Sequence, residues 1–381
     1  MYSQALKARC KLEPLVYLLC AAIISAGRNE NRAMLKVGIT GLGFMGWIHW
    51  LAYQKIEDVQ VVAVCEADTK KLTGDWTSIQ GNFGPPGEQV DLSNIATYSD
   101  MDEMLAQEEL DYVDICLPPG LHCPFTVKAA QAGVNVFTEK PLALQLGDCQ
   151  TMVDACAKSG SLLMVGHVLP FFKEYAYVLE VVRSGKFGKI TGGYFKRVIS
   201  EPTWLPHFFD PDRIGGPMLD LHVHDAHLIR LLFGMPTQVT SHGRMRGEVV
   251  EYCSSLFGFG DNQSGCVVSS SSGVIPQQGR PFTHGFEIHL ERATLHYEFG
   301  AFTDTGEAFP LKILTEDGEV LRPELPEGDE VDSFAAELKE VARAVSAGVV
   351  SDILGGDLAM DAIRICQMET DSVRTGKTVT A

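Results

Sequence analysis

Apolar residues in the first part of the chain come in short runs that are separated by stretches of helical spacing. The runs at 37–40, 59–65 and 112–116 are rich in β-branched residues, as buried strands are. Shorter strands are expected at 95–97, 134–137 and 162–165, and helices at 47–53, directly after Glu66, and at 101–107, 122–132 and 146–158. Strands that alternate with helices predict an α/β fold with a parallel, doubly wound sheet.

The pattern changes in the second half, where polar and apolar residues alternate over long segments. These segments predict strands of a largely antiparallel sheet at 190–199, 238–242, 253–258, 265–271, 286–298 and 311–321, with turns at Gly260-Asp261-Asn262 and Asp317-Gly318. A helical stretch at 218–233 interrupts the strands, and helices at 332–347 and 358–375 close the chain. This part of the chain therefore predicts an α+β arrangement.

The first strand runs directly into a GxGxxG motif at residues 41–46, which opens a helix. Gly41 suits a tight turn, Gly43 lets a pyrophosphate approach the backbone, and Gly46 allows close packing of helix on strand. Free N–H groups at the helix N-terminus favour the phosphates. Glu66 ends the second strand about twenty residues later, where a carboxylate binds a ribose diol. A dinucleotide cofactor is expected to bind Gly41, Leu42, Gly43, Phe44, Met45, Gly46 and Glu66.

The residue at position 66 also bears on which dinucleotide is used. Glu66 favours NAD, because a carboxylate there repels the 2′-phosphate of NADP. Lys70 and Lys71 are close enough in sequence to leave NADP possible. The alternative interpretation of the motif is a glycine turn in some other α/β protein, and the buried strand that leads into Glu66 argues against it.

Two further sets of residues are candidates for chemistry. Lys140 follows a strand, at the carboxyl edge where parallel sheets bind ligands, and is either a solvated loop lysine or a cation that faces the cofactor and a reacting hydroxyl. Asp220 and His224 are four residues apart, on one face of the expected helix. A histidine can accept the proton of an alcohol, and a carboxylate can orient its ring or hold a second hydroxyl. The pair could instead be a structural hydrogen bond.

A metal site is a further possibility, since His222, His224, Asp225 and His227 are close in sequence. On one helix, however, His222 and Asp225 diverge from the face of His224 and His227, so four ligands cannot converge on one ion. The ten cysteines are scattered without a CxxC spacing. We therefore expect no metal ion, and a reducing compartment for the protein.

Composition and charge limit the partners. The 381 residues carry a formal net charge of −18, so the surface repels nucleic acid and anionic membranes, and neither is expected as a partner. Residues 1–33 contain basic residues followed by an apolar run at 15–24, which is too short to span a bilayer. This extension is either an over-read start upstream of Met34 or a signal-like segment. A cytoplasmic location is expected, with export as the alternative.

Taken together, the motifs resemble those of the glucose–fructose oxidoreductase / inositol dehydrogenase (Gfo/Idh/MocA) family over about residues 35–381. The resemblance rests on the glycine motif, Leu117-Pro118-Pro119-Gly120-Leu121-His122, Glu139-Lys140-Pro141, Gly215-Gly216 with Asp220 and His224, and the closing segment 372–379. It implies a Rossmann domain, at 34–156 here, and a substrate-binding and oligomerisation domain at 157–381. The second domain would contain a large, open, mostly antiparallel sheet, and its last helices could pack back on the Rossmann domain.

The resemblance also implies roles for single residues. The residues that match Lys140 and His224 act in catalysis, and the one that matches Asp220 contacts the substrate. Leu117, Pro118, His122, Glu139 and Lys140 lie in segments that bind the cofactor. The implied activity is hydride transfer between NAD(P) and a secondary hydroxyl of a sugar, cyclitol or related polyol. The implied partner is a second copy of the chain, in a dimer or tetramer.

The chain departs from the family pattern at three positions. Pro170 and Lys173 stand where an arginine and a proline are usual, and His227 where an aspartate is common, so the substrate stays open. Two other functions remain as alternatives: an NAD-dependent glycoside hydrolase of the same fold, and a non-catalytic regulator that binds a dinucleotide. A regulator that only binds the dinucleotide needs no proton acceptor, so the presence of His224 argues against this alternative.

Overall fold

The computed structural model of the chain describes residues 34–260 and 265–381. The extension at 1–33 and part of the turn expected at 260–262 lie outside the described residues. Within the described ranges, none of the helices combines the length and the apolar character that a bilayer crossing requires.

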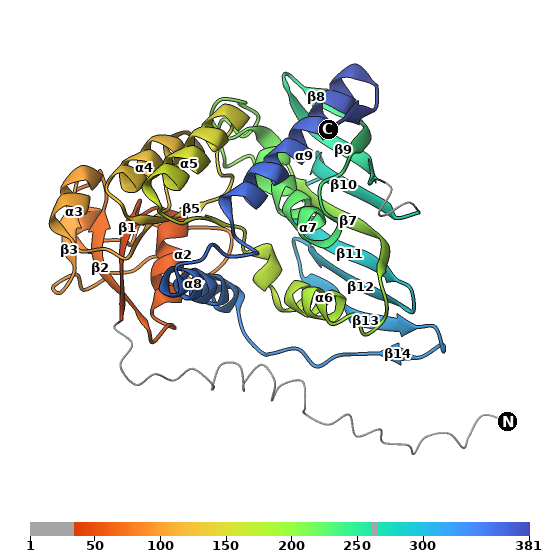
Figure 1. The fold of residues 1–381 in the computed structure, drawn as a ribbon, viewed down its shortest axis with the longest axis horizontal. Coiled ribbons are helices and arrows are strands. Elements are labelled where there is room, and N and C mark those ends of the chain that lie inside the picture. The colour runs from red at the N-terminus through yellow and green to blue at the C-terminus, as the bar shows by residue number, and fades with distance from the viewer. Residues whose placement is uncertain (1–33, 261–264) are drawn as a thin grey trace, which may run out of the picture. The chain divides into compact units, whose positions relative to one another are not determined.

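The first part of the chain forms a parallel sheet of six strands in the order β3-β2-β1-β4-β5-β6 (Figure 1). Its strands are β1 (Leu35–Thr40), β2 (Val59–Cys65), β3 (Ala96–Tyr98), β4 (Tyr112–Ile115), β5 (Asn135–Glu139) and β6 (Leu163–Gly166). The helices between them are α2 (Phe44–Tyr53), α3 (Met101–Gln107), α4 (Pro119–Gln131) and α5 (Leu146–Ser159). The doubly wound sheet is thereby confirmed. The strand order reverses between β1 and β4, which is where such sheets bind ligands.

The prediction of a helix directly after Glu66 is wrong. Only a 3₁₀ turn, Lys71–Thr73, forms there, and Gly74 ends it with a φ of 82°. The Asp68 side chain accepts a hydrogen bond from the backbone N–H of Lys70 (3.0 Å), and this type of contact favours a turn over a helix. The chain then crosses α2, where Pro85 accepts a hydrogen bond from the indole of Trp47 (2.9 Å).

The second part forms a sheet of nine strands in the order β14-β13-β12-β11-β7-β10-β9-β8-β15. All neighbouring strands are antiparallel except β10 and β7. The strands are β7 (Ile190–Ser200), β8 (Gln238–Arg246), β9 (Val249–Gly258), β10 (Val267–Ile275), β11 (Phe282–Leu290), β12 (Ala293–Ala301), β13 (Gly306–Thr315), β14 (Val320–Leu321) and β15 (Val379–Thr380). The mostly antiparallel sheet is confirmed.

Two details of this part differ from the expectation. The segment 286–298 is not one strand, because a tight turn at Glu291-Arg292 separates β11 from β12 and the alternation of residues continues across it. A helix that the sequence analysis did not predict, α6 (Lys173–Ser184), follows β6. Its buried residues Tyr175, Val178, Leu179 and Val181 have the helical spacing that could have revealed it.

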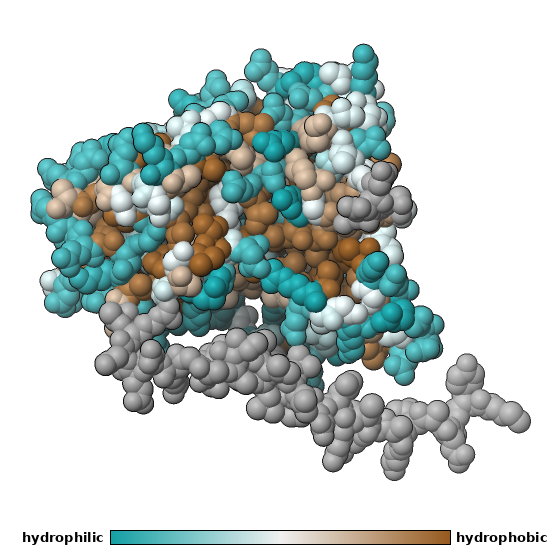
Figure 2. Space-filling model, in the orientation of Figure 1, coloured by the Kyte–Doolittle hydropathy of each residue, from teal (hydrophilic) through white to brown (hydrophobic). Residues whose placement is uncertain are grey.

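Helices α6, α7 (Val223–Phe233) and α9 (Gly356–Thr375) lie along one side of the nine-stranded sheet (Figure 1). Helix α8 (Glu330–Ala347) packs instead against α2 of the first sheet. One apolar core joins residues of both sheets, among them Val113, Val165 and Ile288, with Ile229 of α7. In the view of Figure 2, hydrophobic residues gather around α2 and α7 and hydrophilic residues predominate along the periphery. The first sheet also extends to Gly166, beyond residue 156, where the boundary between the two domains is expected. The position of this boundary stays a prediction.

Candidate active site

The glycine motif forms the turn between β1 and α2. Gly41 has a φ of 94°, and a Cβ at this residue would lie 2.6 Å from the Cys116 carbonyl oxygen. A Cβ on Gly46 would collide with the Gly41 carbonyl. Above Gly43, by contrast, no atom of the described residues comes within 4 Å of the Cβ position. Open space over a helix N-terminus is what the approach of a pyrophosphate needs, so the loop fits a dinucleotide.

Glu66 and Lys71 lie against this loop. The Glu66 carboxylate accepts hydrogen bonds from the backbone N–H of Leu42 (2.7 Å) and of Asp68 (3.0 Å). The Lys71 ammonium donates to the Leu42 carbonyl (2.8 Å) and lies 3.9 Å from Glu66. Lys70 points elsewhere and pairs with Asp75 (2.9 Å). Of the two lysines that left NADP open, only Lys71 therefore reaches the cofactor loop.

His122 contacts both the loop that follows β4 and the loop that follows β5. Its buried ring has Nδ1 at 2.8 Å from the Pro141 carbonyl and Nε2 at 2.7 Å from the Leu117 carbonyl. Burial lowers the pKa of His122. Both nitrogens face protein oxygens, so His122 links the two loops, and its expected contact with the cofactor stays a prediction. His122 is among the residues predicted to bind the cofactor, and the link that it makes between the two loops was not predicted.

Lys140, Asp220 and His224 come together from separate elements. Lys140 follows β5, and its ammonium donates to the Asp220 carbonyl (2.8 Å) and to Asp220 Oδ1 (3.2 Å). Asp220 lies in a π-helical turn, Met218–His222, and His224 in the first turn of α7. The helix expected over 218–233 is therefore two elements, and π turns of this kind are frequent at functional sites. Asp220 and His224 form no hydrogen bond with each other in the described residues.

The protonation state of His224 follows from its surroundings. The side chain is partly buried, and its Nδ1 is buried without a hydrogen-bond partner in the described chain. Burial, together with the cations Lys140 and Arg197, holds the pKa of His224 well below its ordinary value. The imidazole is therefore neutral at pH 7, as a proton acceptor must be.

A second histidine, His167, lies beside His224 and was not predicted as a site residue. It follows β6 directly, and its ring is completely buried with neither nitrogen hydrogen-bonded in the described residues. The ring stands edge to face with that of His224 (centroids 5.9 Å apart, 89°) and is stacked on that of His227 (4.1 Å, 7°). The sequence signal that could have identified His167 as a site residue is its position at the carboxyl end of a parallel strand.

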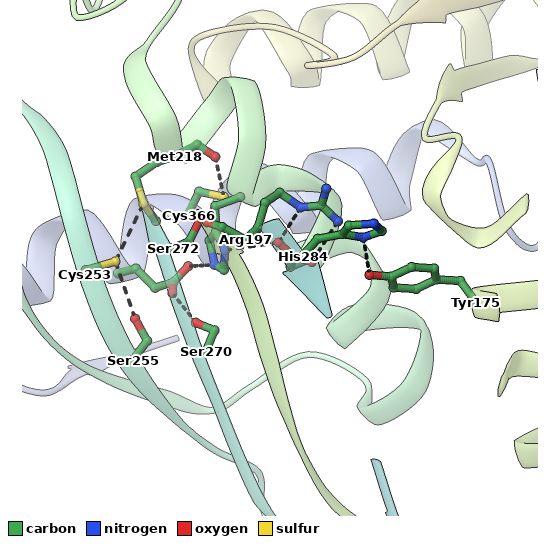
Figure 3. Close-up of polar contacts among 12 residues, drawn as sticks. Tyr175, Arg197, Met218, Cys253, Ser255, Ser270, Ser272, His284 and Cys366 are labelled. Atoms are coloured by element: carbon green, nitrogen blue, oxygen red, sulfur yellow. Dashed lines mark hydrogen bonds and ion pairs between the residues drawn. The ribbon is translucent and has the colours of Figure 1, made fainter. Parts of the chain in front are cut away.

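The π turn and α7 also take part in a buried ionic network, and Figure 3 shows Arg197 among the polar contacts of this region. Arg197 of β7 makes two hydrogen bonds to Asp225 (2.8 and 3.2 Å), and His222 Nε2 lies 2.8 Å from Glu369 of α9. Burial alone would lower the pKa of His222, but Glu369 and Asp225 outweigh it and raise the pKa. Figure 3 also shows the Tyr175 hydroxyl meeting Nδ1 of His284 (2.8 Å). The network anchors the segment that carries Asp220 and His224.

A second network, also missed, links α2 to the Lys140 loop. His49 Nδ1 lies 2.9 Å from Asp114 Oδ2, and His49 Nε2 lies 3.1 Å from Glu139 Oε1. Glu139 Oε2 accepts a hydrogen bond from the backbone N–H of Lys140 (3.0 Å). Burial lowers the pKa of His49, but Asp114 outweighs it and the pKa is raised well above its ordinary value. An imidazolium between two carboxylates therefore connects the glycine helix with the Lys140 loop.

The same network contains the one group of potential metal ligands found in the described residues, His49, Asp114 and Cys116. The Cys116 thiol lies 3.2 Å from His49 Nδ1 and 3.3 Å from Asp114 Oδ1. Burial raises the pKa of this thiol, which disfavours the thiolate that a metal would need. Both nitrogens of His49 already face carboxylates, so a hydrogen-bonded ion pair accounts for the group.

Comparison with known proteins gives both named relatives and similar solved structures. The chain is 33% identical over 211 residues to a 2,7-anhydro-N-acetylneuraminate hydratase of Mediterraneibacter gnavus (54% of this chain, 51% of that protein). It is 29% identical over 208 residues to a D-apiose dehydrogenase of Paraburkholderia graminis (54% and 52%). The chain thus spans about half the length of the curated relatives it matches. An aldose–aldose oxidoreductase structure from Caulobacter crescentus shares the fold, with a TM-score of 0.74 at 22% identity over 91% of this chain and 100% of that one.

Two family descriptions match consecutive parts of the sequence. Residues 35–167, which contain the parallel sheet, match an oxidoreductase family with an NAD-binding Rossmann fold. Residues 175–296, which contain the π turn, α7 and much of the second sheet, match the Gfo/Idh/MocA C-terminal domain. Together the two regions cover more than half of the chain, and the chain belongs to the Gfo/Idh/MocA family of NAD-binding oxidoreductases.

Proposed function

We propose that this protein is an NAD-dependent dehydrogenase that oxidises a secondary hydroxyl of a sugar, cyclitol or related polyol. The observation that carries the proposal is the contact of Lys140, at the carboxyl end of β5, with Asp220 beside His224. This contact lies at the edge of the parallel sheet that also holds the glycine loop. NAD, when bound there, supplies the hydride acceptor. The relative named a D-apiose dehydrogenase supports a sugar-like substrate.

The three residues have separate roles in this proposal. An ammonium group has three N–H donors; Lys140 uses two on Asp220 and keeps the third for the substrate oxygen, on which negative charge develops. Asp220 binds Lys140 through Oδ1 and offers Oδ2 to a second substrate hydroxyl. Neutral His224 accepts the proton of the reacting hydroxyl. Glu139 and His49 hold the Lys140 backbone in place.

The low pKa of His224 predicts the pH dependence of the reaction. His224 must be neutral to accept the hydroxyl proton, and burial with Lys140 nearby lowers its pKa well below 6.5. Alcohol oxidation should therefore persist below pH 6.5, and the acid limb of the kcat profile should lie under that value. We would measure kcat at saturating substrate and NAD from pH 4.5 to 9, a range set by the usual pKa of histidine at about 6.5. An acid limb above pH 7 would contradict a neutral His224.

Glu66 should determine the choice of cofactor. Glu66→Gln removes the charge that binds the ribose diol, and we expect kcat/KM for NAD to fall about 10- to 100-fold, as for the loss of one charge-assisted hydrogen bond. The ratio of NADP to NAD activity should rise, because the repulsion of a 2′-phosphate is lost. Initial rates with both cofactors test this. Lys71→Ala should then lower the NADP rate of the Glu66→Gln protein, whereas Lys70→Ala, whose lysine pairs with Asp75, should leave it unchanged.

The proposal itself is tested by a panel of aldoses, cyclitols and polyols with NAD and NADP, in which reduced cofactor is followed by its absorbance. Turnover of one or more of these compounds supports the proposal. Binding of NAD without turnover of the panel would favour a regulator instead. Release of the aryl group from aryl glycosides without net NADH would favour a glycoside hydrolase.

A further inference from the structure

We propose that His167 is a positioning residue for His224: in the catalytic state it accepts a hydrogen bond from Nδ1–H of His224. This contact leaves Nε2 of His224 unprotonated and ready for the hydroxyl proton. The inference rests on the proposed function, in which His224 is the proton acceptor. Nothing in the sequence motifs assigns a role to His167.

The first observation is a set of buried nitrogens without partners. Nδ1 of His224 and both ring nitrogens of His167 are buried and make no hydrogen bond within the described residues. Buried polar atoms are nearly always paired in folded proteins, so unpaired ones at an active site need an explanation. The two rings are neighbours, with centroids 5.9 Å apart and planes at 89°. With the ring centroids this close, a rotation and small shift of the His224 ring would bring a nitrogen of each ring within hydrogen-bonding distance.

The carboxylates of α7, which carries His224, and of the π turn before it already face a cation, and the free Oδ2 of Asp220 is assigned to a substrate hydroxyl. On the π turn and α7, Asp220 binds Lys140 and Asp225 binds Arg197. On α9, Glu369 lies 2.8 Å from His222 and Asp361 binds Arg230. Lys140 and Arg197 are donors and offer no acceptor atom. His167 is therefore the neighbouring side chain that can take the role a carboxylate often has beside a catalytic histidine.

The position of His167 is fixed by His227. Their rings are parallel at 4.1 Å, and this stacking constrains the plane of the His167 ring. Nε2 of His227 lies 2.9 Å from the Ile353 carbonyl, and because a carbonyl only accepts, this nitrogen carries the hydrogen. Burial lowers the pKa of His227 to about 4 and that of His167 well below its ordinary value. A neutral His167 has one bare nitrogen, which can accept.

The hydrogen bond matters because an imidazole carries its single hydrogen on only one nitrogen. With that hydrogen on Nδ1, the lone pair of Nε2 is free; with it on Nε2, His224 cannot accept a proton there. An acceptor at Nδ1 selects the productive tautomer. When the substrate O–H bond breaks, the proton moves to Nε2, and the Nδ1 hydrogen remains on His224 and is shared with His167. The contact therefore also stabilises the imidazolium that forms.

Two variants of His167 test the proposal by kinetics. His167→Phe keeps the stacking on His227 but removes both nitrogens, and we expect kcat to fall about 10- to 100-fold with KM changed less than about threefold. The acid limb of kcat should also move to lower pH, since the imidazolium loses its partner. His167→Gln returns an acceptor oxygen and should recover part of kcat. A folded His167→Phe protein with the kcat and acid limb of the parent would overturn the proposal.

A second measurement needs no substrate. Ring ¹⁵N chemical shifts of histidine-labelled full-length protein with NAD report which nitrogen carries the hydrogen, and His224→Gln identifies the signals of His224. We expect the Nδ1–H tautomer in the parent and the Nε2–H tautomer in His167→Phe, with no change in a control, His242→Phe, at an exposed position of β8. An unchanged tautomer in His167→Phe overturns the proposal. Absence of turnover with every compound of the panel, by contrast, counts against the proposed function alone.

Discussion

Replacing His224 by alanine should lower kcat for alcohol oxidation about 10²- to 10⁴-fold, the range that a positioned general base contributes. NAD binding should be retained, because His224 lies on α7 and the glycine loop on the first sheet. Lys140→Ala should cause a loss of similar size, since it removes the cation that faces the substrate oxygen and leaves Asp220 without its partner. We would compare kcat at saturating substrate with NAD affinity from fluorescence titration.

The control for both variants is an exposed histidine of the second sheet. His289→Ala changes a side chain that is 43% exposed, on β11, and should leave kcat unchanged. The two losses need not add, because residues that act as a unit show nearly the full effect when either is removed. Near-normal kcat in both His224→Ala and Lys140→Ala would contradict the assigned roles.

Arg197→Met should lower the free energy of unfolding by about 3–5 kcal/mol, the usual effect of removing one partner of a buried ion pair. The Arg197 and Asp225 side chains are 6% and 1% exposed, so the remaining carboxylate would be left buried without its two hydrogen bonds from Arg197. Because Asp225 also lies near His222, the π turn that carries Asp220 should loosen as well. Urea denaturation at pH 7 would give the midpoint and slope for each variant.

Two further variants distinguish this explanation from a general effect of losing arginine. Arg374→Met breaks a surface pair with Asp371, at 54% exposure of the arginine, and should change stability by less than about 1 kcal/mol. The double variant Arg197→Met with Asp225→Asn removes the uncompensated charge and should be more stable than Arg197→Met alone. Equal decreases in the free energy of unfolding of Arg197→Met and Arg374→Met would show that the buried pair has no special importance for stability.

Most of the fold could be predicted from hydrophobic periodicity, and the exceptions have identifiable causes. The parallel strands are buried on both faces, so β1, β2 and β4 stand out as apolar runs. The hairpin of β11 and β12 was read as one strand, since its turn at Glu291-Arg292 does not break the alternation. The helix expected after Glu66 failed because Asp68 and Gly74 favour turns, and short-range hydrogen bonds there compete with helix formation.

The sequence by itself determined the glycine turn, the strand that ends at Glu66, and the helix segment that holds Asp220 and His224. These features depend on neighbouring residues, whose spacing and backbone freedom are visible in the chain. Only the tertiary structure brought Lys140 onto Asp220, placed His167 beside His224, and paired Asp225 with Arg197. Such contacts join residues far apart in sequence, and buried charges and imidazoles select their partners only after the two sheets have formed one core.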